Sequence, residues 1–194
     1  MNRYLLALIG LFLLPSCVVP AQTALKTYTV NVGSTYAEPS IVKSAGDTVQ
    51  FWFKLTSDWA QLYNSTDNST HKICGVRDFL GRNSLRLGVR RASTQRNGLI
   101  AVPYTHNDSK IDYTAFKDPS GKLVLIQFDS LYFCRINSVS GGWKIDIFDA
   151  RMNLICTTTK PISISSYGRI VSGTYVEVGS SPSPWKIRTL IELK

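Results

Sequence analysis

The chain has 194 residues, of which 44% are hydrophobic and 11% aromatic, and its formal net charge is +9. So many hydrophobic and aromatic residues exclude a disordered polypeptide, and the lack of a glycine at every third position excludes a collagen. A polytopic membrane protein would show several long apolar runs, and the sequence has none. The length and composition predict one globular domain.

The first 16 residues have the pattern of a secretory signal peptide. Arg3 precedes an apolar run over residues 5–14, and small residues follow that run. Ten apolar residues are too few to cross a bilayer as a helix, which takes about 20 residues. We therefore expect a cleaved signal at residues 1–16, a short tether at residues 17–25, and a single domain over residues 26–194.

The end of the signal resembles the lipobox of bacterial lipoproteins. The tetrad is Leu14-Pro15-Ser16-Cys17, with Pro15 as a departure from the usual pattern. The resemblance implies that Cys17 becomes an acylated N-terminus, and Val18 after it favours the outer membrane. Cleavage near Ala21 would instead give a secreted protein without a lipid anchor. Both readings predict an exported chain.

Beyond the signal, apolar and polar residues alternate as they do in half-buried strands. The alternation begins at residues 28–32 and returns at residues 49–55, where the odd-numbered side chains form an apolar face. A short helix is expected around Ser57 to Tyr63, before the polar loop of residues 64–70. Residues 85–90 alternate again, with Leu85, Leu87 and Val89 on one face. Further strands are predicted at residues 100–106, 123–128, 131–136, 143–148 and 185–193.

The connections carry turn residues. Asn97-Gly98 is the strongest signal for a two-residue hairpin, because both positions accept a positive φ. Asp118-Pro119-Ser120-Gly121, Ser140-Gly141-Gly142 and Ser44-Ala45-Gly46-Asp47 are further turn signals. Many short strands separated by such turns predict an all-β fold, an antiparallel β-sandwich.

The last segments resemble the closing strands of concanavalin A-like lectin and glucanase sandwiches. Residues 174–179, 180–184 and 185–188 carry this resemblance. It implies a jelly-roll whose curved sheet forms a groove for a glycan, with aromatic rings stacked on sugar faces. The ring candidates are Trp52, Trp59, Tyr104, Trp143 and Trp185.

Three cysteines follow Cys17: Cys74, Cys134 and Cys156. An odd number in an exported protein allows at most one disulfide. Their spacing contains no Cys-x-x-Cys and no histidine at zinc-ligand distance, so we expect no metal and no cofactor. We expect buried thiols that pack as small apolar side chains.

The candidate ligand-binding residues are Arg86, Arg90, Tyr104, His106 and Trp143. Arg86 and Arg90 share one strand face, and guanidinium groups there suit carboxylates, sulfates or sugar hydroxyls. His106 ends the next strand at a loop, whereas His71 is expected at the surface. If Asn97 and Gly98 are the central turn residues, Arg91 faces Tyr104 and Val89 faces His106. That register puts His106 and Arg90 on opposite faces, so the residues would not converge without a bulge.

Residues 83–90 also resemble the Arg-Ser-Glu-Leu-Arg strand motif of alginate-lyase-type polysaccharide lyases, although the glutamate is absent. The resemblance implies that Arg86 would neutralise a uronate carboxylate while Tyr104 and His106 act as base and acid. Lys and Arg are spread along the chain and no recognition motif is present, so nucleic acid is not expected as a partner. Three hypotheses follow: a glycan-binding envelope module, a structural or assembly protein of the envelope without a small ligand, and a polysaccharide lyase or hydrolase.

Overall fold

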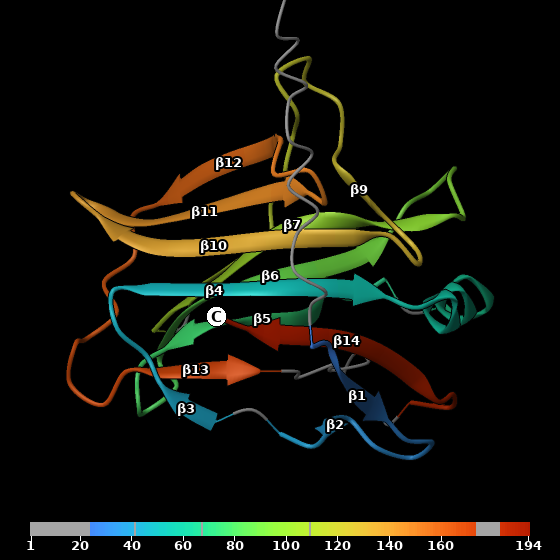
Figure 1. Ribbon diagram of the computed structural model, residues 1–194, viewed down its shortest axis with the longest axis horizontal. Coiled ribbons are helices and arrows are strands. Elements are labelled where there is room, and N and C mark those ends of the chain that lie inside the picture. The colour runs from blue at the N-terminus through green and yellow to red at the C-terminus, as the bar shows by residue number, and fades with distance from the viewer. Residues whose placement is uncertain (1–23, 41, 67, 109, 174–182) are drawn as a thin grey trace, which may run out of the picture.

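The computed structural model describes residues 24–40, 42–66, 68–108, 110–173 and 183–194. Fourteen strands in this part of the chain form two antiparallel sheets of seven strands each, which pack face to face (Figure 1). The predicted antiparallel β-sandwich is confirmed. The expected strand at residues 174–179 lies outside the described residues. None of the described helical segments is long and apolar enough to cross a bilayer.

The sheet nearer the viewer in Figure 1 is the front sheet. Its strands, in spatial order, are β12 (Leu154–Lys160), β11 (Gly142–Asp149), β10 (Leu131–Val139), β4 (Thr48–Leu55), β14 (Ile187–Leu193), β1 (Lys26–Val30) and β2 (Ala37–Glu38). The back sheet has the order β3 (Val42–Ser44), β13 (Ile170–Gly173), β5 (His71–Arg77), β6 (Asn83–Arg91), β7 (Gly98–Asn107) and β8 (Lys110–Asp112), and β9 (Leu125–Gln127) also pairs with β7.

The core lies between the sheets and follows the predicted alternation. In β4 the side chains of Phe51, Phe53 and Leu55 are completely buried, and in β6 those of Leu85 and Leu87 face them from the back sheet. Complete burial of a large apolar side chain contributes about 1.5–3 kcal/mol. Burial of the two inner faces therefore supplies the main driving force for folding. Polar and charged side chains can lie on the two outer faces.

The predicted short helix is confirmed as the 3-10 helix η1 (Ser57–Asn64). Its Trp59 is fully buried, and the indole N–H donates to Thr189 Oγ1 at 3.1 Å. The Tyr63 hydroxyl lies 2.5 Å from the carbonyl oxygens of Gln95 and Gly98, so it can donate to one of them at a time. The helix thus closes one end of the core and holds the β6–β7 connection in place.

The β6–β7 connection differs from the predicted two-residue hairpin. Residues 92–97 join the strands, Arg91 pairs with Leu99, and Tyr104 pairs with Arg86 instead of Arg91. Gly98 is already part of β7, where a Cβ atom would lie 2.4 Å from the carbonyl oxygen of Ile126. The predicted register is wrong because this glycine permits the close approach of β9 and does not form a turn.

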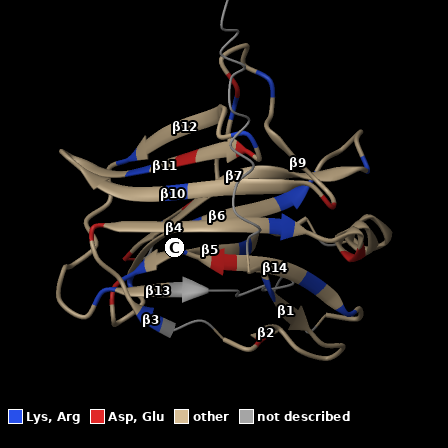
Figure 2. Cartoon of the chain, in the orientation of Figure 1, with Lys and Arg blue, Asp and Glu red and all other residues tan. Residues whose placement is uncertain are grey.

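His71 was expected at the surface, and this expectation is also wrong. Its side chain is fully buried on the inner face of β5, in edge contact with Trp59 at 5.8 Å between ring centroids. Cys74, Cys134 and Cys156 are buried, as predicted, and all three are free thiols. Lys and Arg are distributed over strands of both sheets, as Figure 2 shows, and are not gathered in one block.

Candidate functional site

Four of the predicted site residues lie on one face of the back sheet, the outer face that points away from the core. Arg86 in β6 is directly opposite Tyr104 in β7, and Arg90 is opposite Ile100. His106 is opposite Ser84 and therefore lies on this same face. The observed register brings together the residues that the predicted register separated.

Arg86 and Tyr104 are nearly covered, with 9% and 8% of their surface exposed. Lys72 Nζ lies 4.7 Å from the centroid of the Tyr104 ring. Gly88 is next to this pair, and a Cβ atom there would come within 2.8 Å of Thr70 Cγ2. The centre of the outer face is therefore tightly packed and offers no open ring on which a sugar could stack.

His106 is half-buried at the end of β7. Its Nδ1 lies 3.3 Å from the carbonyl oxygen of Gly81 in the β5–β6 turn. One residue, Thr105, separates His106 from Tyr104, and their Cα atoms are about 7 Å apart along β7. His106 is therefore the next residue along β7 on the same outer face as Tyr104.

Arg90 opens onto a pocket of about 520 Å³ at the free edge of the back sheet. We call this the edge pocket. Its lining residues come from β6 and from the segment that follows β7: Arg90, Ile111, Asp112, Tyr113, Thr114, Ala115, Lys117 and Leu123.

The edge pocket combines unpaired cations with exposed apolar surface. Among the described residues, neither Arg90 nor Lys117 has an ion-pair or hydrogen-bond partner for its side chain. The Tyr113 ring and the side chains of Ile111 and Leu123 are exposed beside these cations. Such cations can pair with an anionic group, and an exposed ring can pack against an apolar surface.

Asp112 is the acidic residue of this pocket, and its charge is already compensated. Lys160 Nζ lies 2.7 Å from Asp112 Oδ2, and the Thr114 N–H donates to Oδ1 at 2.8 Å. Partial burial alone would raise the pKa of this carboxyl, but the hydrogen bonds from Lys160 and Thr114 lower the pKa to about 2. The uncompensated charge of the described pocket residues is therefore positive.

Trp143 lies apart from the other predicted site residues, at the end of β11. Its face points into the core, 2% of its surface is exposed, and the Arg169 guanidinium carbon lies 4.7 Å from its ring centroid. It borders a second pocket of about 380 Å³, together with Ser163 and Arg169. Trp143, which was predicted as a ligand-binding residue, therefore offers little exposed ring surface to a ligand.

The other ring candidates also serve packing. Trp59 belongs to the core, Trp185 packs against the core, and Trp52 lies on the outer face of the front sheet at 5.0 Å from the Phe133 ring. On that same face, the buried carboxylate of Asp146 accepts hydrogen bonds from Arg135 and Thr157. In the part of the chain that the structure describes, no group of three or more His, Cys, Asp or Glu could hold a metal ion.

Most of the edge pocket was not predicted from the sequence. Arg90 was among the predicted site residues. The predicted turn at Asp118–Gly121 lies outside the lining and is confirmed, with Gly121 at φ 82°. Tyr113 and Lys117 were passed over because they follow β8 in a segment with no clear strand period. The available signal in the sequence was a tyrosine and a lysine in a segment between predicted strands, since such connections often carry binding groups.

No family model matches the chain, and no curated protein matches its sequence. Among solved structures, the alginate lyase from Klebsiella pneumoniae has a TM-score of 0.50 at 10% identity, over 76% of this chain and 58% of that chain. This chain therefore spans less than two thirds of that protein.

Two further structures are less similar. The carbohydrate-binding module CBM66 from Bacillus subtilis has a TM-score of 0.39 at 10% identity, over 88% of this chain and 92% of that chain. The enzymatically active domain of tailspike protein 2 from bacteriophage CBA120 has a TM-score of 0.40 at 12% identity, over 84% of this chain and 24% of that chain. At these identities the likeness is one of fold alone.

Proposed function

We propose that the chain is an exported glycan-binding β-sandwich that holds an acidic polysaccharide in the edge pocket. The observation that carries this proposal is the presence of Arg90 and Lys117 beside the exposed ring of Tyr113 in one pocket. Neither cation is neutralised by a described residue, whereas the acidic residue of the pocket already has a partner.

The chemistry of these groups fits an acidic sugar. The planar guanidinium of Arg90 can donate two parallel hydrogen bonds to a carboxylate or sulfate, and Lys117 adds a point charge. The Tyr113 ring can pack on the apolar face of a sugar while its hydroxyl remains in water. A volume of about 520 Å³ lies within the range of small-molecule sites, about 300–1,000 Å³.

The N-terminal pattern supports export and attachment to the outer membrane through Cys17. A protein there would meet lipopolysaccharide and acidic polysaccharides, and the net charge of +8 that remains after removal of Arg3 with residues 1–16 (21 Lys and Arg minus 13 Asp and Glu) favours contact with both. The lipid anchor is tested separately by metabolic labelling with a radioactive fatty acid. We expect label in the native chain and none in Cys17→Ser, and label in both would exclude this anchor.

The binding proposal is tested with a glycan array and the purified full-length chain in mild detergent. We expect binding to acidic glycans that weakens as salt is raised, because screening reduces the contribution of Arg90 and Lys117. Arg90→Ala, Lys117→Ala and Tyr113→Ala should each lower the affinity about tenfold. Tyr113→Phe should retain binding, since it keeps the ring.

Lys122→Ala is the matched control, because Lys122 is exposed and lies outside the pocket lining. It removes one positive charge from the chain without touching the pocket. If Lys122→Ala weakened binding as much as Arg90→Ala, the affinity would come from net charge and the edge pocket would be excluded. Failure to bind any acidic glycan would overturn the proposal.

A polysaccharide lyase is the second candidate, favoured by the direct pairing of Arg86 with Tyr104 on the outer face. Arg86 would neutralise a uronate carboxylate, and Tyr104 or His106 would exchange the proton. The test is an absorbance assay for unsaturated uronate products from acidic polysaccharides, with Tyr104→Phe expected to abolish the signal. Absence of product excludes this candidate. A structural envelope protein is the outcome in which neither binding nor product is detected.

A further inference from the structure

The β5–β6 turn and the segment before β13 lie at the left-hand end of the sandwich in Figure 1. Together they carry three exposed large apolar side chains. Phe79 and Leu80 are in the β5–β6 turn and are 70% and 71% exposed, and Tyr167 precedes β13 and is 88% exposed. A Cβ atom on Gly168 would lie 2.9 Å from Phe79 Cβ, so the two turns touch. We call Phe79, Leu80 and Tyr167 the tip patch.

The β5–β6 turn is locked by the carboxylate of Asp78. Its Oδ1 accepts the Arg82 N–H at 2.9 Å, and its Oδ2 accepts the N–H and side-chain amide of Asn83 at 3.0 and 2.9 Å. Gly81 has a φ of 72° and donates its N–H to the Asp78 carbonyl at 3.1 Å. Phe79 and Leu80 are therefore presented on a fixed backbone.

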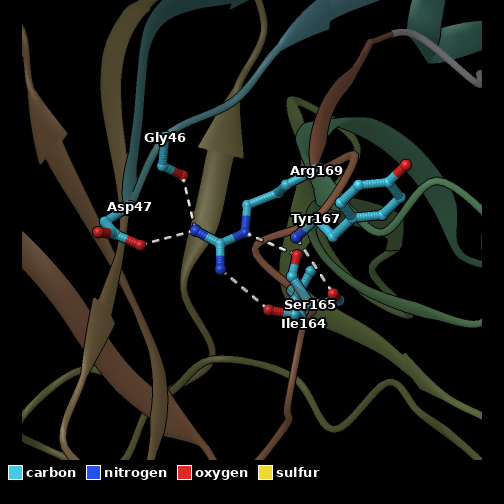
Figure 3. A network of polar contacts seen from close by, with 6 residues as sticks. All are labelled: Gly46, Asp47, Ile164, Ser165, Tyr167 and Arg169. Carbon is cyan, nitrogen blue, oxygen red and sulfur yellow. Dashed lines mark hydrogen bonds and ion pairs between the residues drawn. The ribbon is translucent and has the colours of Figure 1, made fainter.

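The turn that carries Tyr167 is held by Arg169, as Figure 3 shows. The buried guanidinium donates to the carbonyl oxygens of Ile164 and Ser165 and binds Asp47 Oδ1 at 2.7 Å. The Tyr167 N–H donates to Ser165 Oγ at 3.2 Å, and the Tyr167 ring points away from this network. The Tyr167 ring is therefore exposed because the hydrogen-bonded turn holds it in solvent.

The charges around the tip patch favour a negatively charged partner. Arg82 is exposed in the β5–β6 turn, and Lys43 is exposed on β3, which pairs with β13; neither cation has an ion-pair partner among the described residues. Asp47 is already paired with Arg169. Asp108, next to the β5–β6 turn, is the one exposed acid without an ion pair in the described residues of these connections.

We propose that the tip patch docks on an anionic lipid bilayer. Phe79 and Leu80 would enter the boundary between headgroups and acyl chains, and Tyr167 would lie at headgroup level, where tyrosine is enriched. Lys43 and Arg82 would add attraction to anionic headgroups. The patch is too small for a stable contact with a second copy, because an aromatic side chain buries about 150–250 Å² and each partner of a stable complex buries about 800 Å².

The docking surface is independent of glycan binding and of acylation at Cys17, and it is tested by position-specific dyes on the full-length chain. The described cysteines are buried, and burial raises the pKa of Cys74 and Cys156 to about 12, so a new surface thiol can be labelled selectively in a Cys17→Ser background. Leu80→Cys and Tyr167→Cys place an environment-sensitive dye on the patch. Met152→Cys, in the exposed β11–β12 turn at the opposite end, is the control.

With phosphatidylglycerol vesicles we expect the dyes at positions 80 and 167 to shift to shorter wavelength and to be quenched by a lipid-borne quencher. The dye at position 152 should do neither. The N-terminal segment is the same in all three variants, so its own affinity for lipid cannot produce this difference. Equal responses at the three positions, or none at positions 80 and 167, would overturn the proposal.

A second measurement removes the patch. The combined variant Phe79→Ser, Leu80→Ser and Tyr167→Ser should bind phosphatidylglycerol vesicles about tenfold more weakly than the original chain. The control variant Met152→Ser and Leu154→Ser removes exposed apolar surface elsewhere and should bind normally. If the patch variant instead dissociated an oligomer in ultracentrifugation and bound vesicles normally, the partner would be a second copy of the chain, contrary to the proposal.

Discussion

Lys160 Nζ in β12 lies 2.7 Å from Asp112 Oδ2 in β8, and this ion pair joins the edge strands of the two sheets. Asp112 also lines the edge pocket, while both residues border a smaller pocket of about 180 Å³. One contact therefore closes the open side of the sandwich and fixes the wall of the candidate site. It also neutralises the carboxylate that would otherwise repel an acidic ligand.

The Lys160–Asp112 pair should make stability depend on pH. Because the folded pKa of Asp112 is about 2, below its ordinary 3.8, the contribution is present above pH 3.8 and is lost as pH falls toward 2. Asp112→Asn should lower the free energy of unfolding at pH 7 by about 1 kcal/mol or less, and should cost little at pH 2. Urea unfolding at both pH values measures this difference.

The partner substitution Lys160→Met serves as the control. In a double-mutant cycle at pH 7, the combined variant should lose less than the two single losses added together, since each substitution breaks the same contact. Strict additivity would mean that the pair contributes no coupling energy.

Arg169→Lys should destabilise the sandwich although the charge is kept. A lysine ammonium cannot reproduce the planar fork that reaches Ile164, Ser165 and Asp47 together. We expect a loss of about 2 kcal/mol in unfolding free energy, since buried groups would lose their hydrogen bonds. Faster proteolysis within residues 161–169 should accompany the loss. An unchanged cleavage rate would show that Arg169 does not hold this segment.

Gly75→Ala should prevent stable folding. A Cβ atom at this position would lie 2.2 Å from the Leu85 carbonyl oxygen and 2.5 Å from Arg86 Cα, so β5 and β6 could not keep their spacing. Gly46→Ala is the matched control, because no heavy atom lies within 4 Å of its added Cβ. We expect a loss above about 3 kcal/mol for Gly75→Ala and no loss for Gly46→Ala, measured by thermal unfolding. Similar melting temperatures for the two variants would contradict the strand spacing.

The three described thiols should resist alkylation in the native state. Burial raises the pKa of Cys74 and Cys156 to about 12 and that of Cys134 well above 9, so almost no thiolate is present at neutral pH. In a Cys17→Ser background, mass spectrometry after iodoacetamide should detect no adduct on the folded chain and three after unfolding in guanidinium. Rapid native labelling of Cys74 would show that the core opens at β5.

Local sequence patterns were sufficient to predict many of the strands and their apolar faces, although β12 and β13 were not predicted. The apolar face of Phe51, Phe53 and Leu55 follows from the two-residue period of a strand, and it needs no knowledge of neighbouring strands. The turn at Asp118–Gly121 likewise follows from the residues within it. These are local properties, because they depend on backbone preferences and on which side chains avoid water.

The pairing of Arg86 with Tyr104 was not predictable in the same way. Asn97-Gly98 favours a tight hairpin, yet the packing of β9 against Gly98 and the contacts of Tyr63 with the connection fix a longer loop. A change of register alters every cross-strand partner, so one tertiary contact determined which candidate residues share a face.

The sequence by itself determined that this chain is strand-rich and that buried and exposed side chains alternate along its strands. Only the tertiary structure decided that Arg90, Tyr113 and Lys117 line one pocket, that Trp143 and His71 are buried, and that Phe79 lies beside Gly168. The physical reason is that strand formation depends on neighbours in sequence, whereas pockets and surface patches form between segments far apart in the chain, where the packing of two sheets sets the distances.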